Sequence, residues 1–375
     1  MNFLNKQFFY AILLFLFTGF LPVLPDQNQD KQVTIQKIPE DPATPSTELT
    51  KRPVGILFAG DTHFEWAIDD MQKKYSMYFP AENLKSMFDK SDFRILNLET
   101  TISEKTKPVN SKSYVFRAHP QQASLLNYLD INLAVIANNH TMDMGPEGLE
   151  NTLRSLTERA IPAVGAGMDY KEARSPYYFT VRGVKFAVVS LSTIGAKELF
   201  TYGKNPGVLP LTNQIYRDIA AAKKSADHVI VSIHWGIEYS PRPDRNQIII
   251  ARRMIDFGAT AVIGHHPHIP QAVEYYKHGV IAYSLGNFLF GSINHYQSTN
   301  FVIQLLFHPE NSSLYGIEIY PITGDYKKTG HKVSPLTEND AEHFWKRFYT
   351  QCLELNPIKP EISIQKEGYG IWLKK

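Results

Sequence analysis

From Pro53 onward, short apolar runs typical of β-strands alternate with longer segments that have the apolar spacing of helices. The strand-like runs include PVGILFAGD, FRILNLET, INLAVIANNH, VKFAVVSLS, HVIVSIHWG and TAVIGHH. Between them lie segments with helical spacing, such as GPEGLENTLRSLTERA and RNQIIIARRMIDFG. This alternation predicts an α/β fold with a largely central, buried sheet.

After TAVIGHH the pattern changes, because four strand-like runs follow with little helix between them: QAVEYYKHG, VIAYSLGNFLF, TNFVIQLLFHP and LYGIEIYPI. We expect antiparallel strands here that complete a second sheet. The segment ENDAEHFWKRFYTQCLEL is predicted to form a final helix that packs back through Phe344, Phe348 and Leu353. We therefore expect one domain over residues 53–325 and a C-terminal extension with one helix over 326–375.

The N-terminal segment differs from the rest of the chain. One lysine, Lys6, precedes an uncharged apolar run over residues 8–24. This run is at the lower limit for crossing a bilayer and somewhat long for the core of a signal peptide. We interpret residues 1–25 as an uncleaved signal anchor, with a cleaved signal peptide as the alternative. Residues 26–52 lack periodicity and are predicted to form a flexible tether.

Either interpretation of the N-terminus places the remaining chain outside the cytoplasm, in the cell envelope, anchored to the membrane or secreted. A formal net charge of +2 disfavours nucleic acid as a partner, because it provides no field for wrapping a polyanion. Cys352 is the single cysteine of the sequence. Intrachain disulfides, thiolate zinc sites and iron–sulfur clusters are therefore excluded.

Five of the strand-like runs end in side chains of types that bind metal ions. These residues are Asp61, His63, Glu99, Asn139, His140, His234, His265, His266 and His268. In open α/β sheets, functional sites form at the carboxyl ends of the strands. Oxygen and imidazole ligands without thiolates suit Zn, Mn, Fe or similar divalent ions.

Each of these features alone has an ordinary structural explanation. Asp61 can cap a following helix, Glu99 can be an exposed strand end, and His234 can be a buried histidine with satisfied hydrogen bonds. The pair Asn138-Asn139 suits a turn, because asparagine tolerates left-handed backbone. Their joint occurrence at successive strand ends favours a metal site.

Six motifs, in chain order, make the sequence recognisable: GDTH, NLET, ANNHTMDMGPEG, HWGIEY, GHHPHIPQ and SLGNFLF. Together they resemble the CapA family of capsule and poly-γ-glutamate synthesis proteins, which looks like a branch of the calcineurin-like metallophosphoesterases. The resemblance covers about residues 54–291. It implies a four-layer αββα sandwich with two divalent metal ions (Mn, Zn or Fe) at one edge of the two sheets.

The resemblance also implies roles for individual residues. Asp61 and His63 match a first motif that holds one ion. Asn139 and His234 match ligands of the second ion, and His140 matches the acid that protonates the leaving group. Glu99 stands where phosphoesterases have an aspartate that bridges both ions, and this departure leaves open whether Glu99 bridges them.

The last metal motif in phosphoesterases is Gly-His-x-His, and here it reads Gly264-His265-His266-Pro267-His268. Its spacing favours His266 and His268 as the ligand pair. His265 then occupies the place of the usual glycine, as a residue behind the ligands or one that contacts substrate.

Four more residues are expected around the site. Asn138 is predicted to orient its loop, and Asp143 to fix the ring of His140. Asn287, in the SLGNF motif, is predicted to support the site. Arg242 can bind a phosphate or carboxylate as a fork, or it can simply cover the surface beside two prolines.

Three functions remain open from the sequence. The first is a metal-dependent hydrolase of the cell envelope that acts in the biosynthesis of an anionic polymer such as a capsule or poly-γ-glutamate. The second is a non-catalytic subunit of a membrane polymer-synthesis or export complex. The third is a generic phosphomonoesterase. The expected partners are an anionic polymer or phosphoester substrate, the membrane through the N-terminal segment, and a polymer-synthase complex.

Overall fold

The computed structural model describes residues 52–105, 107–109, 112–294, 297–336 and 338–374. All of them belong to one of two units of the chain, Glu40–Lys375. The predicted signal segment and all but the last residue of the predicted tether lie outside the described residues. Among the described residues, none of the helices combines the length and apolarity needed to cross a bilayer.

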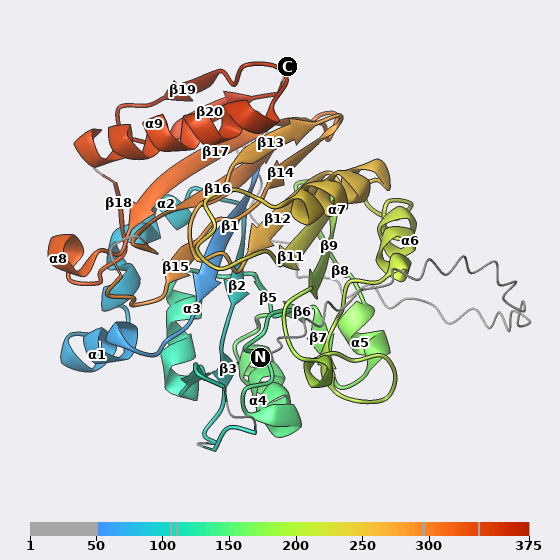
Figure 1. Ribbon diagram of the computed structural model, residues 1–375, viewed down its shortest axis with the longest axis vertical. Coiled ribbons are helices and arrows are strands. Elements are labelled where there is room, and N and C mark those ends of the chain that lie inside the picture. The colour runs from blue at the N-terminus through green and yellow to red at the C-terminus, as the bar shows by residue number, and fades with distance from the viewer. Residues whose placement is uncertain (1–51, 106, 110–111, 295–296, 337, 375) are drawn as a thin grey trace, which may run out of the picture. The chain divides into compact units, whose positions relative to one another are not determined.

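Two large β-sheets form the centre of this unit (Figure 1). The first sheet has ten strands in the order β19-β20-β17-β16-β1-β2-β5-β6, with β15 paired to β1 and β18 paired to β17. Their bounds are β1 (Val54–Thr62), β2 (Phe93–Leu98), β5 (Leu133–Val135), β6 (Ala163–Val164), β15 (Asn287–Leu289), β16 (Thr299–Phe307), β17 (Leu314–Thr323), β18 (Ser334–Pro335), β19 (Ile362–Ile364) and β20 (Gly370–Leu373).

The second sheet has six strands in the order β13-β14-β12-β11-β9-β8. They are β8 (Tyr177–Val181), β9 (Val184–Ser192), β11 (His228–His234), β12 (Ala261–His265), β13 (Val273–Tyr276) and β14 (Gly279–Ala282). Two small ladders accompany the large sheets, one from β3 (Thr101–Ile102) and β4 (Arg117–Ala118), the other from β7 (Ala166–Gly167) and β10 (Gly207–Val208).

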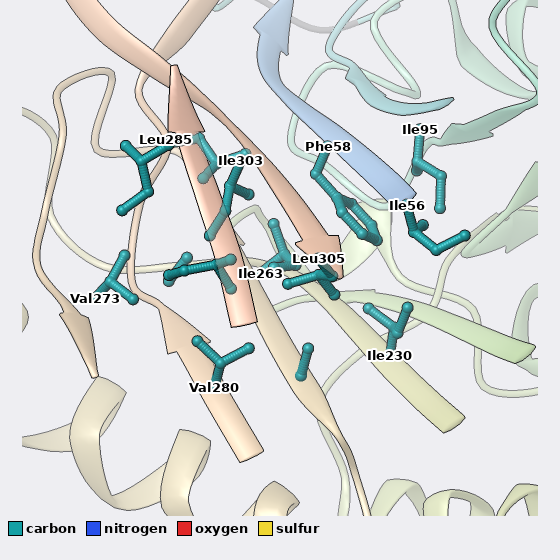
Figure 2. Packing of buried hydrophobic residues seen from close by; sticks show 14 of the residues in the cluster. Ile56, Phe58, Ile95, Ile230, Ile263, Val273, Val280, Leu285, Ile303 and Leu305 are labelled. Atoms are coloured by element: carbon teal, nitrogen blue, oxygen red, sulfur yellow. The ribbon is translucent and has the colours of Figure 1, made fainter. Parts of the chain in front are cut away.

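The two sheets pack face to face through apolar side chains (Figure 2). Ile56 and Phe58 of β1 point into this interface, together with Ile230 of β11 and Ile263 of β12. Successive strand residues point to opposite faces, so Leu57 of β1 packs on the outer side of the first sheet instead. Strands buried on both faces explain why these runs are apolar almost throughout.

Helices cover both outer faces. Against the first sheet pack α1 (Ala67–Lys74), η1 (Phe79–Leu84), α2 (Lys85–Phe88), η2 (Pro120–Ala123), α3 (Ser124–Tyr128) and α4 (Gly145–Glu158), where η marks a 3₁₀ helix. Against the second pack α6 (Asn213–Ala222) and α7 (Arg245–Asp256), on the right in Figure 1. The short helices α5 (Tyr170–Arg174) and η3 (Lys197–Leu199) lie in connections. The predicted four-layer αββα arrangement is confirmed.

The late antiparallel strands differ from the prediction. They do not all complete one second sheet, because β13 and β14 extend the second sheet whereas β16 and β17 join the first. Strand β16 pairs antiparallel with β1 from Val54 to Phe58, and β17 pairs antiparallel with β16. Apolar runs alone carry no information about which neighbour each strand chooses, which is why this prediction was wrong for β16 and β17.

The C-terminal extension contains more than the predicted helix. Besides α9 (Glu338–Leu355) it contributes α8 (Tyr326–Thr329) and strands β18, β19 and β20, and β20 pairs antiparallel with β17. Phe344 and Phe348 of α9 are buried against the core between the sheets, whereas Leu353 is exposed. Cys352 is buried on the same helix, and burial raises the pKa of its thiol to about 12.

Candidate metal centre

The polar residues of the candidate site lie at the ends of strands from both sheets. Strands β1, β2 and β5 run parallel in the first sheet, and β11 and β12 run parallel in the second. Their carboxyl ends carry Asp61, Glu99, His140, His234 and His265, in that strand order. All five side chains are buried. Because the sheets pack face to face, these ends lie close together although they are far apart in sequence.

Two groups of side chains offer ligand atoms within 4.8 Å of one another: Asp61, Glu99 and His234 in one, and Glu99, His266 and His268 in the other. Glu99 belongs to both groups. A carboxylate shared between two clusters is placed where a bridging ligand of two ions would lie. The longer side chain, which departs from the aspartate of phosphoesterases, thus still reaches both clusters.

Glu99 provides the test of whether this site fits a cation. Its side chain is fully buried, and neither carboxylate oxygen accepts a hydrogen bond. Two histidine ring nitrogens lie near Oε1, His234 Nε2 at 3.5 Å and His140 Nε2 at 4.0 Å. Burial, reinforced by the Asp61 carboxylate, raises the pKa of Glu99 well above its usual value. A buried carboxylate without partners is costly, and a bound cation removes that cost.

Three histidines of the site, His234, His265 and His266, are held in their neutral form. Burial lowers the pKa of His265 to about 4 and that of His266 to about 3, the latter with help from the charge of His268. Burial and the neighbouring histidines lower the pKa of His234 well below its ordinary value. Neutral imidazoles have a free lone pair near pH 7, which metal ligation requires.

The Asp61 carboxylate accepts hydrogen bonds from two separate segments of the site. Its Oδ1 accepts a hydrogen bond from Asn97 Nδ2 at 2.8 Å, and its Oδ2 accepts one from the backbone N–H of His266 at 3.1 Å. His268 Nδ1 lies 3.1 Å from Oδ2 and His265 Nδ1 lies 3.6 Å from Oδ1. Burial opposes ionisation, but the hydrogen bond and charge of His268 and the charge of His265 outweigh it, so the pKa of Asp61 is lowered.

Asn139 and His234, the predicted ligands of a second ion, contact each other directly. Asn139 Oδ1 lies 2.7 Å from His234 Nε2. The neighbouring Asn138 faces inward and is fully buried. Its side chain donates to Asn97 Oδ1 and the carbonyl of Leu98, and it accepts from the backbone N–H of His140. These hydrogen bonds hold the loop that presents Asn139 and His140.

His140 forms a pair with Asp143. Its Nδ1 lies 2.7 Å from Asp143 Oδ2, which leaves Nε2 directed towards Glu99 at 4.0 Å. Asp143 Oδ2 also accepts from the backbone N–H of Phe116 at 2.8 Å, and its Oδ1 binds Lys112 Nζ at 2.6 Å. Lys112 also donates to the carbonyl of Asn139. This network fixes the orientation of the His140 ring and the protonation of its Nδ1.

His63 is set apart from the other predicted ligands, because it belongs to neither cluster. Its Nδ1 accepts a hydrogen bond from the backbone N–H of Glu65 at 3.1 Å, while its buried Nε2 has no partner. In the neutral ring this bond places the proton on Nε2, so that nitrogen offers no lone pair in this orientation. The His63 ring stacks on Phe116 with centroids 4.1 Å apart.

Three further predicted residues have different outcomes. Asn287 Oδ1 lies 2.9 Å from His268 Nδ1, so it supports a predicted ligand. His265 is buried at the site, and neither of its ring nitrogens has a hydrogen-bond partner. Arg242 is not brought to the site: its guanidinium forks onto Glu354 of α9 at 2.7 and 2.6 Å. The sequence left open a phosphate or carboxylate ligand or a plain surface role for Arg242, and here a carboxylate of the chain itself occupies the fork.

The sequence reasoning missed Asn97 and Lys112. The Asn97 side chain donates a hydrogen bond to Asp61 and accepts one from Asn138. A signal for it existed, since it interrupts an apolar strand two residues before Glu99 and alternation places both on one face. Lys112 lies in a polar segment without periodicity, and no local pattern marks it.

Comparisons with known proteins agree with the motifs. Residues 55–292 match the family described as bacterial capsule synthesis protein PGA_cap. The chain is 32% identical over 236 residues to the PGA biosynthesis protein CapA of Bacillus subtilis (strain 168), and 30% identical over 248 residues to the capsule biosynthesis protein CapA of Bacillus anthracis. These alignments cover 62% and 63% of this chain but only 62% and 59% of the two relatives.

Solved structures show more distant likeness. A putative 5′-nucleotidase from Staphylococcus aureus in complex with α-ketoglutarate matches with a TM-score of 0.49 and 15% identity, over 79% of this chain and 58% of that one. A hypothetical protein from Thermus thermophilus matches with a TM-score of 0.45 and 16% identity, over 72% of this chain and 98% of that one. The family match spans more than half of the sequence and includes every strand end of the site. The chain therefore belongs to the bacterial capsule synthesis protein family PGA_cap.

Proposed function

We propose that this protein is a metal-dependent hydrolase of the phosphoester class that acts in the assembly of a capsule or a poly-γ-glutamate-type polymer. The buried Glu99 carboxylate, without partners and shared by two clusters, is the observation that carries the proposal. The relatives named for PGA and capsule biosynthesis support the process. The apolar N-terminal segment supports a place in the cell envelope, attached to the membrane.

In this proposal Asp61, Glu99, His234, His266 and His268 hold the metal ions, and Asn139 adds a neutral ligand. His63 would join them only after its ring turns, or after its proton moves from Nε2 to Nδ1 and the hydrogen bond from Glu65 is lost. Two divalent ions in such a site activate water and stabilise the negative charge that develops on a phosphoryl group. With two anionic side chains against two dications, the site keeps positive charge for an anionic substrate.

The residues of the chain supply the proton. His140 would act in its doubly protonated form, in which Nδ1–H donates to Asp143 and Nε2–H gives its proton to the leaving oxygen. Asp143 orients the ring and stabilises its charged form, and Lys112 neutralises part of the Asp143 charge. Burial lowers the pKa of His140, although the hydrogen bond and charge of Asp143 oppose that shift. Asn138 fixes the backbone that carries this residue.

Two histidines of strand β11 provide a matched test in the full-length protein. His234 ends the strand at the site, whereas the buried His228 begins it away from the site. We expect roughly two divalent ions per chain in the wild type, and metal-dependent hydrolysis of an aryl phosphate. His234→Ala should lose metal and activity, and His228→Ala should keep both. A protein that folds equally well without any bound ion would refute the proposal and favour a non-catalytic subunit of a polymer-synthesis complex.

A further inference from the structure

A row of aromatic rings borders the candidate metal centre. We call it the aromatic arc and define it by Tyr114, Trp66, Phe290, His268 and Tyr239. In this order the ring centroids are 5.9, 5.6, 4.7 and 6.1 Å apart. The arc is thus continuous, and it includes one of the proposed metal ligands, His268.

Three rings of the arc are open to solvent. Trp66 is 41% exposed, Tyr239 is 49% exposed and Tyr114 is 63% exposed. The other three tryptophans of the chain, at 235, 345 and 372, are all buried. Large exposed aromatic side chains that gather at one place mark binding sites more often than ordinary surface. Their position beside the metal centre points to substrate.

Backbone conformation separately distinguishes this region. Trp66 has φ of 55° and Tyr239 has φ of 62°, and the proposed ligands His266 and His268 have φ of 95° and 59°. For bulky residues a positive φ is strained, and such strain persists where the surrounding structure enforces it, commonly at functional sites. The chain therefore holds two half-exposed aromatic rings in place at an energetic cost.

The charges near the arc do not suit a polyanion. The cations nearest in sequence to its two ends are Lys112 and Arg242, and both are engaged, with Asp143 and Glu354 respectively. Glu238, next to Tyr239, adds negative charge that raises the pKa values of both Tyr239 and Glu99, in each case in addition to burial. Away from the proposed metal ions, a chain of carboxylates laid along the arc would meet the negative charge of Glu238 instead of ion pairs with Lys112 or Arg242.

We infer that the aromatic arc binds an uncharged ring of the substrate, a sugar or a nucleobase, next to the phosphoryl group that the proposed hydrolase attacks. The arc is then not the binding site of an anionic polymer backbone. The planes of Trp66 and Tyr114 are 73° apart, so the bound ring stacks on the face of one of them and meets the edge of the other. The exposed Tyr114 can offer its hydroxyl group to the polar edge of the ring. Because it deepens the proposed function, this inference places a ring-bearing phosphoester among the small precursors or intermediates of polymer assembly.

Binding of non-hydrolysable phosphonates tests the arc without relying on turnover. The full-length, Mn²⁺-loaded protein is titrated calorimetrically with methylphosphonate, with the methylene phosphonate analogues of glucose 1-phosphate and adenosine 5′-monophosphate, and with penta-γ-glutamate. At least one ring compound should bind roughly tenfold or more tightly than methylphosphonate, as expected for stacking on an aromatic side chain. Which of the two binds better identifies the ring.

Variants at exposed positions test whether the arc causes the tighter binding of ring-bearing phosphonates relative to methylphosphonate, which is called the gain below. Trp66→Ala and Tyr114→Ala should each reduce the gain at unchanged metal content, and Trp66→Phe should retain most of it. Equal binding of ring and methyl phosphonates, tighter binding of penta-γ-glutamate, or alanine variants that behave like the wild type would overturn the inference. In the first and last of these cases metal and phosphonate binding persist, so the proposed function survives.

If the protein bound no metal, the proposed function would fail and the arc would be tested separately. Trp66 is the one half-exposed tryptophan of the chain, so acrylamide quenching of tryptophan fluorescence reports mainly on it. Protection by adenosine or methyl glucoside would support the arc as a ring-binding site, and unchanged quenching by both would refute it.

Discussion

At the scale of single residues, the candidate site combines opposite demands on protonation. Glu99 lies in surroundings that disfavour its charge, and Asp61 lies in surroundings that stabilise its charge. The histidines between them are neutral because burial removes water from their rings. A bound metal ion would resolve the conflict at Glu99 and would use the lone pairs of the neutral rings.

His140 is proposed to protonate the leaving oxygen of the substrate. The effect of removing His140 should therefore depend on how basic that oxygen is. His140→Ala should lower kcat roughly 10²- to 10⁴-fold for an alkyl phosphate, whose leaving oxygen is strongly basic. For p-nitrophenyl phosphate, with a weakly basic leaving oxygen, the loss should be much smaller. Steady-state kinetics on both substrates measure this difference. An equal loss on both, at unchanged metal content, would contradict a role as proton donor.

At the scale of elements, β11 carries a buried histidine at each end, and only one belongs to the site. His228 lies beside Thr260 Oγ1, with its Nδ1 at 3.0 Å, and its Nε2 contacts the carbonyl of Ser312. Burial lowers the pKa of His228 to about 4. The imidazole of His228 is therefore neutral and has a structural role.

The lowered pKa of His228 predicts a dependence of stability on pH. Between pH 6.5 and about 4 the unfolded chain binds a proton that the folded chain does not, so acidification favours unfolding. The contribution is present above pH 6.5 and is lost as the pH falls, by up to about 1.4 kcal/mol per pH unit. His228→Asn should show a correspondingly flatter dependence than the wild type in urea unfolding at several pH values. Parallel curves would contradict the assignment.

At the scale of the whole described unit, the C-terminal extension completes the core. Helix α9 lies beside β20 in Figure 1, and Phe344 and Phe348 pack into the cluster between the sheets. Strand β20 lengthens the first sheet beyond β17. The extension therefore belongs to the same hydrophobic core as the segment that carries the site.

Two substitutions on α9 test this integration. Phe348 is 1% exposed, so Phe348→Ala should lower the free energy of unfolding by roughly 3–5 kcal/mol through the cavity it leaves. Leu353, which the sequence predicted to pack inward, is exposed, and Leu353→Ala should change it by less than about 0.5 kcal/mol. Chemical denaturation measures both. A small effect at Phe348 would mean that α9 is a dispensable attachment.

Much of this architecture was readable from the sequence because it depends on local patterns. Apolar runs of strand length, the helical spacing between them and the polar residues at their ends predicted the α/β class and the site residues. Asp61, Glu99 and His234 could be named because strand ends of this kind converge in α/β folds. The choice of neighbours for β16 and β17 could not be predicted, since an apolar run fits either sheet.

The tertiary structure decided which side chains meet. Asp61 receives the backbone N–H of His266 across 205 residues, and Arg242 is engaged by Glu354 across 112 residues. Such pairs depend on how two sheets and a terminal helix pack, and no local pattern records that packing. The same is true of Lys112 beside Asp143 and of the aromatic arc, whose rings come from separate loops. The sequence by itself determined the residue types and strand ends of the site, and three-dimensional packing alone determined its contacts.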